Sequence, residues 1–191
     1  MKYLLGIGLI LFAVLILGGT YIPLLQQEIN YRLGKYSLTQ DIKETKPLDT
    51  DFGIIIPKIG ANSRVVKNVD PFNSQEYQVA LTKGVAHARG SSLPGQPGNI
   101  FLFSHSSADF LNATKYNSIF YLLSKLEKDD IIKLYYAGKE LDYLVQDKKI
   151  VEPGAIEYLK GDSKDETVTL MTCWPPGTAI KRLVILAEEI R

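Results

Sequence analysis

The chain has 191 residues, and its 22 basic and 21 acidic side chains leave a formal net charge of +1. These charges are spread along the chain without a basic stripe, so we expect no nucleic-acid partner. A single cysteine excludes an internal disulfide, and the roughly 160 residues that follow the first 27 are enough for one self-supporting domain.

The first predicted element is a membrane anchor at residues 1–27. No charged residue lies between Tyr3 and Gln27, and residues 4–17 are apolar throughout. As a helix, this uncharged stretch would reach roughly 37 Å, against a hydrocarbon core of about 30 Å. A cleaved signal peptide is the competing interpretation, but the small residues after the apolar run form no clear cleavage site. We therefore expect an uncleaved signal-anchor, whose orientation the flanking charges leave open.

A polar stem is expected at residues 28–51, where the charges are mixed and no apolar period is sustained. Residues 52–191 then change to short β-like runs and predict a mainly-β domain, either a barrel or a sandwich. Two helices interrupt this pattern, one capped by Asn73 or Ser74 and ending at Gly84, the other between Thr114 and Leu126. The predicted strands are residues 53–57, 64–67, 99–103, 131–136, 140–145, 167–171 and 182–186.

Three polar residues stand at the ends of predicted strands. Cys173 ends one run and Arg182 begins the next, with a turn-forming Pro-Pro-Gly sequence between them, and His105 ends another run. A thiol with a pKa near 8.5 needs a base or a cation to become nucleophilic at neutral pH, and these residues supply both. The pattern predicts covalent acyl-transfer chemistry. His87 is the other candidate base, and we favour His105.

Each residue also has a structural interpretation. A lone cysteine is commonly a small buried hydrophobe, and an arginine on a strand commonly covers apolar surface with its stem. Trp174, beside the cysteine, either lines a cleft or fills the core.

Several motifs in this order resemble those of bacterial sortases. They are residues 56–60 (Ile-Pro-Lys-Ile-Gly), residues 84–87 (Gly-Val-Ala-His), His105, residues 169–175 (Thr-Leu-Met-Thr-Cys-Trp-Pro) and Arg182 at the start of a strand. The resemblance covers about residue 52 to the end. It implies a closed eight-stranded β-barrel with one or two short helices behind an N-terminal transmembrane helix.

The same resemblance implies a membrane-anchored cysteine transpeptidase or endopeptidase. Cys173 would attack a sorting signal of the Leu-Pro-x-Thr-Gly type near the C-terminus of a secreted protein and hold a thioester. His105 would be the general acid and base, and Arg182 would bind the substrate or the oxyanion. His87, Thr172 and Trp174 would contact the substrate.

The implied partners are secreted proteins with such a signal, an amine acceptor (a cell-wall precursor or a pilin lysine) and the membrane, with the domain outside the cytoplasm. No cofactor or metal is expected, and the scattered acidic residues do not identify a calcium site. Two details differ from the family pattern. Ser104 stands where glycine usually precedes the catalytic histidine, and Asp70-Pro71-Phe72, similar to a lid motif, is interpreted as the start of a helix.

Three alternatives remain open. An L,D-transpeptidase also uses cysteine, histidine and arginine, but its motif places them within a few residues, whereas His105 and Cys173 are far apart in this chain. A tethered barrel without activity would serve binding or scaffolding. A hydrolase would release the thioester to water rather than to an amine.

Overall fold

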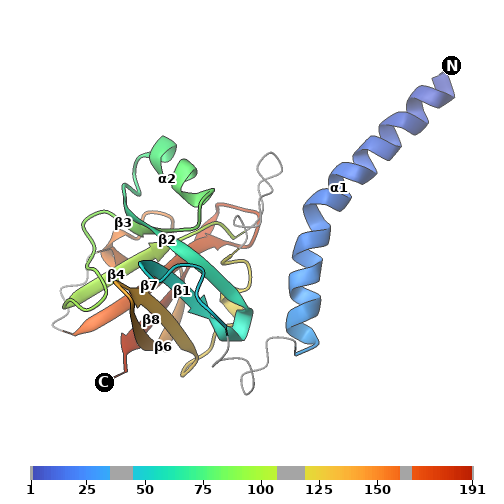
Figure 1. Cartoon of the computed structure of the whole chain (residues 1–191). Helices are drawn as coiled ribbons and strands as arrows, with labels where there is room; N and C mark the ends of the chain where they lie inside the picture. Colours follow the sequence, from blue (N-terminus) through green and yellow to red (C-terminus); the bar gives the residue numbers. More distant parts are fainter. Residues whose placement is uncertain (1, 35–44, 107–118, 160–164, 191) are drawn as a thin grey trace.

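A computed structural model describes residues 2–34, 45–106, 119–159 and 165–190. The helix α1 spans Lys2–Arg32 and extends away from the remainder of the chain (Figure 1). Within the described ranges, no helix is both long and apolar enough to cross a membrane, so the expected transmembrane helix is not confirmed. The helix also continues past residue 27, where the sequence predicted a polar stem.

The C-terminal end of α1 contacts the barrel beside a short 3-10 helix, η2 (Leu123–Lys125). The ammonium of Lys125 lies 3.2 Å from a carboxylate oxygen of Glu28 and 5.3 Å from the centre of the Tyr31 ring. Tyr31 also packs against the barrel's hydrophobic core. These contacts attach the end of α1 to the domain.

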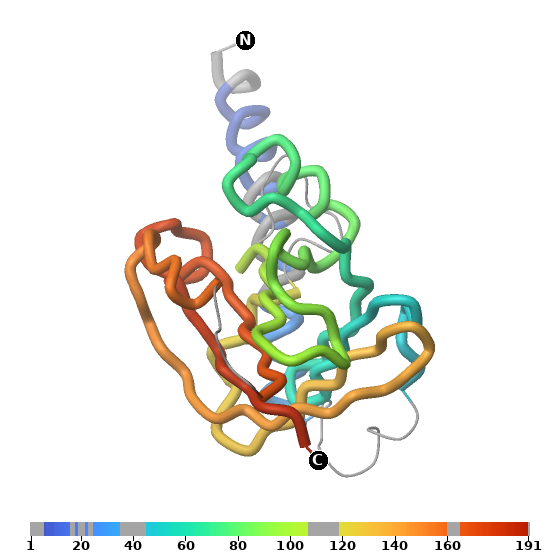
Figure 2. Tube along the Cα trace, turned by 90° about the vertical axis from the view of Figure 1, so that its left-hand side faces the viewer, coloured from blue at the N-terminus to red at the C-terminus, as the bar shows by residue number. Residues whose placement is uncertain are grey.

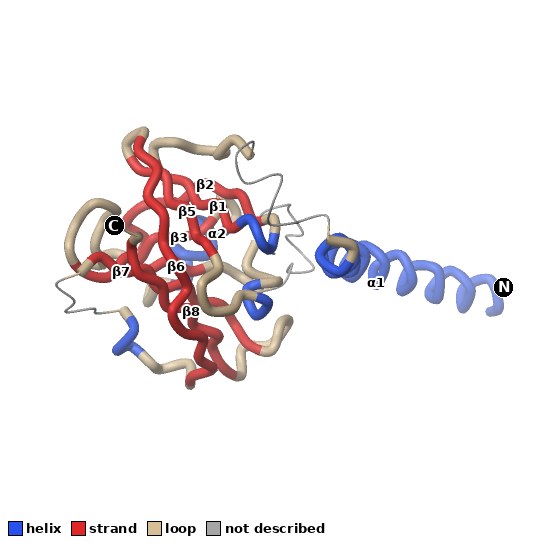
Figure 3. Tube along the Cα trace, turned by 90° about the horizontal axis from the view of Figure 1, so that it is seen from below, coloured by secondary structure: helices blue, strands red, loops and turns tan. Residues whose placement is uncertain are grey.

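Eight strands close into a barrel in the order β1-β2-β3-β4-β7-β8-β6-β5, and Figure 3 shows these strands in red from below. The β2–β3 and β4–β7 pairs are parallel, and the other neighbours are antiparallel. The closed mainly-β barrel is therefore confirmed. Its strands are β1 (Phe52–Ile56), β2 (Ala61–Val69), β3 (Val85–Ala88), β4 (Gly98–Phe103), β5 (Ile131–Tyr136), β6 (Lys139–Val151), β7 (Glu166–Trp174) and β8 (Lys181–Glu189).

Six of the seven predicted runs lie within strands, and the seventh, residues 53–57, matches β1 except for Pro57, which begins η1; β3 is the strand that the sequence analysis missed. It has four residues, and its alanines and histidine carry little β propensity. The predicted helix at residues 73–84 is α2 (Ser74–Leu81), with Asn73 as its N-cap. Most of the helix expected between residues 114 and 126 lies outside the described residues. Two further 3-10 helices, η1 (Pro57–Ile59) and η3 (Ile156–Tyr158), lie in connections.

The strands carry apolar side chains on both faces, which follow the two-residue alternation of a β-strand. On β4, Ile100 and Leu102 belong to the cluster inside the barrel. Phe101 and Phe103 belong to a second cluster on the outer face, together with Leu81 of α2. Because α2 lies over this outer face, it stands close to the ends of β4 and β7 (Figure 1).

Candidate active site

Cys173 and Arg182 are paired across two antiparallel strands. The register of β7 and β8 places them directly opposite each other, and the strands run side by side in Figure 2. Side chains at opposite positions of an antiparallel pair lie on the same face with Cβ atoms about 5 Å apart. Both residues are half-buried, and the thiol is free. The connection with Pro175 thus brings the thiol and the guanidinium together, as the sequence predicted.

The alternation along β7 shows which face carries the thiol. Leu170 belongs to the cluster inside the barrel, and Trp174 packs against the same cluster. Met171, between them, packs against the outer cluster beneath α2. Cys173 shares the outer face with Met171 because side chains two residues apart on a strand point the same way.

His105 reaches the same edge of the barrel from β4. The backbone N–H of Ser104 donates to the carbonyl of Met171 (3.2 Å), and the hydroxyl of Thr172 donates to the carbonyl of Ser104 (2.8 Å). Phe103 lies opposite Met171 in the parallel pair, so two further residues along each chain bring His105 level with Cys173. The three residues predicted for catalysis therefore lie at the same edge of the barrel, at the ends of three neighbouring strands.

The guanidinium of Arg182 is oriented by the connection between β7 and β8. Its Nη1 donates to the carbonyl of Ala179 (3.1 Å) and to the carbonyl of Lys181 (3.0 Å). These two bonds use only Nη1. The N–H groups on Nε and Nη2 are not used by them, and a guanidinium fixed at one end presents a rigid set of donors at the other.

His87 occupies a different environment. It is buried, with 2% of its surface exposed, and its ring centre is 5.6 Å from that of Phe52 in the interior cluster. Its Nδ1 accepts from the backbone N–H of Asn68 (3.2 Å), so Nε2 of the neutral ring carries the proton and donates to the carbonyl of Ser92 (3.0 Å). Burial lowers the pKa of His87 below its ordinary value. These contacts favour a structural role over substrate binding.

Thr172 and Trp174, the other residues expected to bind substrate, face the interior rather than the thiol. Thr172 is buried and its hydroxyl holds the end of β4 against β7. Trp174 is half-buried against the interior cluster. The structure therefore places both beside Cys173 in sequence but on the opposite face of β7.

A cavity of about 280 Å³ opens on the outer face farther along β7. Its floor includes Thr169, four residues or roughly 13 Å from Cys173 at the rise of a β-strand. The side-chain carbonyl of Asn99 accepts from the hydroxyls of Thr167 (3.2 Å) and Thr169 (2.9 Å), which makes this floor rigid. Tyr158 of η3 forms part of the wall.

Two further residues lie beside His105: Gln78, which sequence reasoning did not identify, and Ser104, which it noted only as a departure from the family pattern. The side-chain carbonyl of Gln78 on α2 lies 3.2 Å from Nε2 of His105. Ser104 is 5% exposed, and its hydroxyl is without a hydrogen-bond partner among the described residues. No pattern around Gln78 marks it, because it is one of several polar residues on a short helix. Within the described ranges, no group of three or more histidine, cysteine, aspartate or glutamate side chains is arranged to hold a metal ion.

Comparison with known proteins gives concordant results. A family model described as the sortase domain matches residues 54–190. Sortase D of Bacillus subtilis (strain 168) is 28% identical over 138 residues, which are 71% of this chain and 61% of that protein. The match thus spans about three-fifths of the relative's length.

Solved structures show the same fold. Sortase C-1 from Actinomyces oris superposes with a TM-score of 0.62 at 27% identity, covering 88% of this chain and 85% of that one. Sortase C2 of pilus island 1 from group B Streptococcus gives 0.63 at 24% identity, covering 81% of each chain. A sortase D5 transpeptidase from Clostridium perfringens gives 0.61 at 20% identity, covering 87% of this chain and 94% of that one.

Proposed function

Because the chain belongs to the sortase family, we propose that it is a cysteine transpeptidase that acts on a Leu-Pro-x-Thr-Gly-type sorting signal near the C-terminus of secreted proteins. The observation that carries this proposal is the register that sets Cys173 opposite Arg182. The hydrogen bonds of Ser104 to β7 bring His105 to the same edge. A nucleophile, a proton carrier and a fixed cation are the groups that acyl transfer through a thioester requires.

In the first step, the thiolate of Cys173 attacks the carbonyl carbon of the scissile peptide bond. The carbonyl π electrons move to oxygen, and the N–H groups of Arg182 stabilise the resulting oxyanion. When the carbonyl re-forms, the C–N bond breaks and the imidazolium of His105 gives its proton to the leaving amine. The products are a thioester on Cys173 and a free C-terminal fragment.

In the second step, an amine of a cell-wall precursor or a pilin lysine attacks the thioester carbonyl. His105, now neutral, takes the proton from the attacking nitrogen, and the C–S bond breaks to release the Cys173 thiolate. A new amide bond forms, and the proton carried by His105 is ready for the next cycle. Water competes with the amine for the same thioester, and its attack gives hydrolysis.

The sorting-signal peptide is proposed to bind along the outer face of β7. An extended chain rises about 3.3 Å per residue, so four residues span the distance from Cys173 to Thr169 at the cavity. A signal bound along this face would place its scissile carbonyl at the thiol and its preceding residues at the cavity. Tyr158 in the cavity wall would then contact the peptide residues farthest from the scissile bond.

We further propose that the domain lies outside the cytoplasm and is held at the membrane by residues 1–27. Support comes from the exposed apolar side chains of α1, including Leu9, Phe12 and Leu15, because such a surface needs lipid or protein to cover it. Sedimentation of membranes and protease treatment of intact cells test the location. Recovery of the whole chain in the soluble fraction, protected from protease, would contradict it.

The activity is tested by incubating the full-length chain with peptides of the Leu-Pro-x-Thr-Gly type and recording mass spectra of the intact protein. We expect an acyl adduct that disappears in Cys173→Ala. We expect His105→Ala to lose turnover with an added amine. An absence of adduct with every peptide, from a folded wild-type protein, would contradict the transpeptidase and favour a binding domain.

A further inference from the structure

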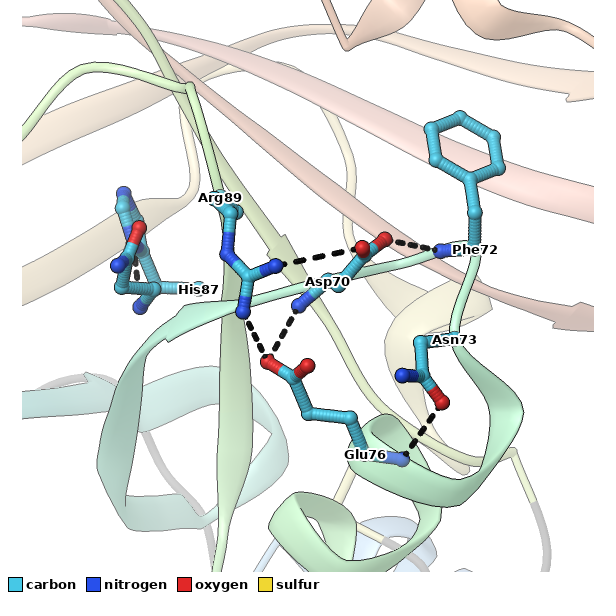
Figure 4. Close-up of polar contacts among 7 residues, drawn as sticks. Asp70, Phe72, Asn73, Glu76, His87 and Arg89 are labelled. Carbon is cyan, nitrogen blue, oxygen red and sulfur yellow. Dashed lines mark hydrogen bonds and ion pairs between the residues drawn. The ribbon is translucent and has the colours of Figure 1, made fainter.

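The helix α2 is fixed to the barrel by an ion-pair cluster at its first turn. Arg89, directly after β3, contacts Glu76 (2.6 Å) and Asp70 (3.3 Å) through its two Nη atoms. The carboxylate of Glu76 also accepts from the backbone N–H of Asp70 (2.9 Å). Figure 4 shows these groups converging from the ends of β2 and β3 and from α2. The start of the helix is thereby tied to two strands.

Other contacts determine the rotation of α2 about its axis. The side-chain oxygen of Asn73 caps the helix by accepting from the backbone N–H of Glu76 (3.2 Å). Leu81 is buried in the outer cluster, and the ring of Tyr77 meets that of Phe103 edge-on with centres 6.3 Å apart. With the capped end and the buried side both fixed, the neighbouring position Gln78 has a defined direction.

The side chain of Gln78 points toward His105. The side-chain carbonyl of Gln78 lies 3.2 Å from Nε2 of the imidazole. An amide oxygen only accepts hydrogen bonds, so the ring nitrogen facing it carries the proton, both in the neutral ring and in the imidazolium.

We propose that Gln78 is a positioning residue for His105: it accepts a hydrogen bond from Nε2, holds the plane of the imidazole and fixes a proton on Nε2. This inference rests on the proposed transpeptidase function. It adds a role for α2, which the cluster around Arg89 connects to β2 and β3. The neighbouring Gln75 is exposed on the same helix and provides a matched control.

The kinetic test compares full-length wild type with Gln78→Ala, Gln78→Glu and Gln75→Ala. Loss of one orienting hydrogen bond in Gln78→Ala should lower kcat about tenfold and leave KM within about twofold. Gln78→Glu keeps an acceptor oxygen and should recover part of kcat. Its negative charge beside the imidazole should also move the limb of the pH–rate profile that reports the imidazole upward by about one unit. Gln75→Ala should match wild type.

An NMR titration tests the contact between Gln78 and His105 independently of activity. The chain has two histidines, so His105→Gln assigns their ring signals. Cys173 on β7, Arg182 on β8, His87 on β3 and Glu76 on α2 are the same in every Gln78 and Gln75 variant compared. We expect the His105 titration midpoint to rise in Gln78→Glu and to stay unchanged in Gln75→Glu.

The outcomes separate the two proposals. Identical His105 titration in wild type, Gln78→Ala and Gln78→Glu overturns the Gln78 inference. So does a wild-type kcat and pH profile in Gln78→Ala when wild type forms the thioester. Failure of folded wild type to acylate Cys173 overturns the transpeptidase itself, and with it the catalytic role of Gln78, whatever the titration shows.

Discussion

Cys173 on β7 and Arg182 on β8 are direct cross-strand partners in an antiparallel register. A half-buried thiol therefore faces the same side of the sheet as a guanidinium whose Nη1 already donates to the carbonyls of Ala179 and Lys181, which precede it in the chain. The pairing depends on strand register rather than on a flexible loop. A one-residue slip of β8 would turn Arg182 to the other face and leave the thiol without its cation.

Replacement of Arg182 should slow acylation without unfolding the barrel. If its N–H groups on Nε and Nη2 stabilise the oxyanion, Arg182→Ala should reduce the rate of thioester formation about 10²- to 10³-fold. Arg182→Lys keeps the charge but loses the planar fork, and should fall between Ala and wild type. Single-turnover mass spectrometry measures the rate.

The control for this prediction is Lys181→Ala. Lys181 is an exposed neighbour of Arg182 on β8, and its ammonium lies 3.5 Å from a carboxylate oxygen of Glu152. It should acylate at the wild-type rate. A rate for Arg182→Ala within about threefold of wild type would show that the guanidinium has no part in the transition state.

Ser104→Ala should stabilise the protein. The Ser104 hydroxyl is buried and is without a hydrogen-bond partner among the residues that the structure describes. An unsatisfied buried hydroxyl costs about 1 kcal/mol or more, so its removal should raise the free energy of unfolding by about that amount. Urea denaturation followed by circular dichroism gives the value.

Thr172→Val is the matched comparison, because the Thr172 hydroxyl donates to the Ser104 carbonyl (2.8 Å). Its loss should destabilise the fold by about 1 kcal/mol. If both variants shift stability in the same direction, the assignment of satisfied and unsatisfied hydroxyls is wrong.

His87 should make the fold less stable as the pH falls below about 6.5. Burial lowers its pKa in the folded state, so the unfolded chain binds a proton at a pH where the folded chain does not. Stability is therefore complete above the unfolded pKa and declines as the pH falls toward the folded pKa. The urea midpoint measured from pH 7 to pH 5 should decrease.

The histidine responsible is identified by substitution. His105→Gln should keep the decrease, whereas His87→Gln should lose most of it, because glutamine does not titrate. A decrease that persists unchanged in His87→Gln would assign the effect to another group.

Glu166 should contribute strongly to stability. It is 7% exposed and accepts from the hydroxyl of Tyr143 and from the backbone N–H of Gly95 (2.9 Å). Burial and this carboxylate raise the pKa of Tyr143, which keeps its hydroxyl protonated. Glu166→Ala leaves both donors without their acceptor and should lower the free energy of unfolding by about 3 kcal/mol.

Glu188→Ala, at an exposed position of β8, serves as the control and should change the free energy of unfolding by less than about 0.5 kcal/mol. Urea denaturation of both variants measures the difference. Equal effects would mean that the buried contacts of Glu166 add nothing beyond those of an exposed carboxylate.

Local patterns predicted much of this fold. The apolar and β-branched runs identified the strands that flank the site, and the Asn73 cap identified α2. The turn-forming residues after Cys173 predicted the return of the chain to Arg182, because a short antiparallel connection leaves few other arrangements. β3 was missed because its four residues have no distinctive composition.

The face on which a side chain lies was less predictable. His87, Thr172 and Trp174 belong to the sequence motifs that suggested substrate binding, yet the structure directs them toward the interior. Side chains alternate between the two faces of a strand, so the position of a residue within its strand determines whether it points into the barrel. Adjacency to the nucleophile in the sequence carries no information about this direction. The expected transmembrane helix is likewise not confirmed among the described residues.

The sequence by itself determined the mainly-β class, the strand ends and the identities of the thiol, the imidazole and the guanidinium, because alternation, caps and turn residues act over a few positions, and it left open whether the strands form a barrel or a sandwich. Only the tertiary structure decided which histidine shares a face with Cys173 and that Gln78 reaches His105 from α2. The parallel pairing of β4 with β7 joins segments 68 residues apart, as between Phe103 and Met171. Contacts over such separations depend on how the barrel closes, which no local pattern specifies.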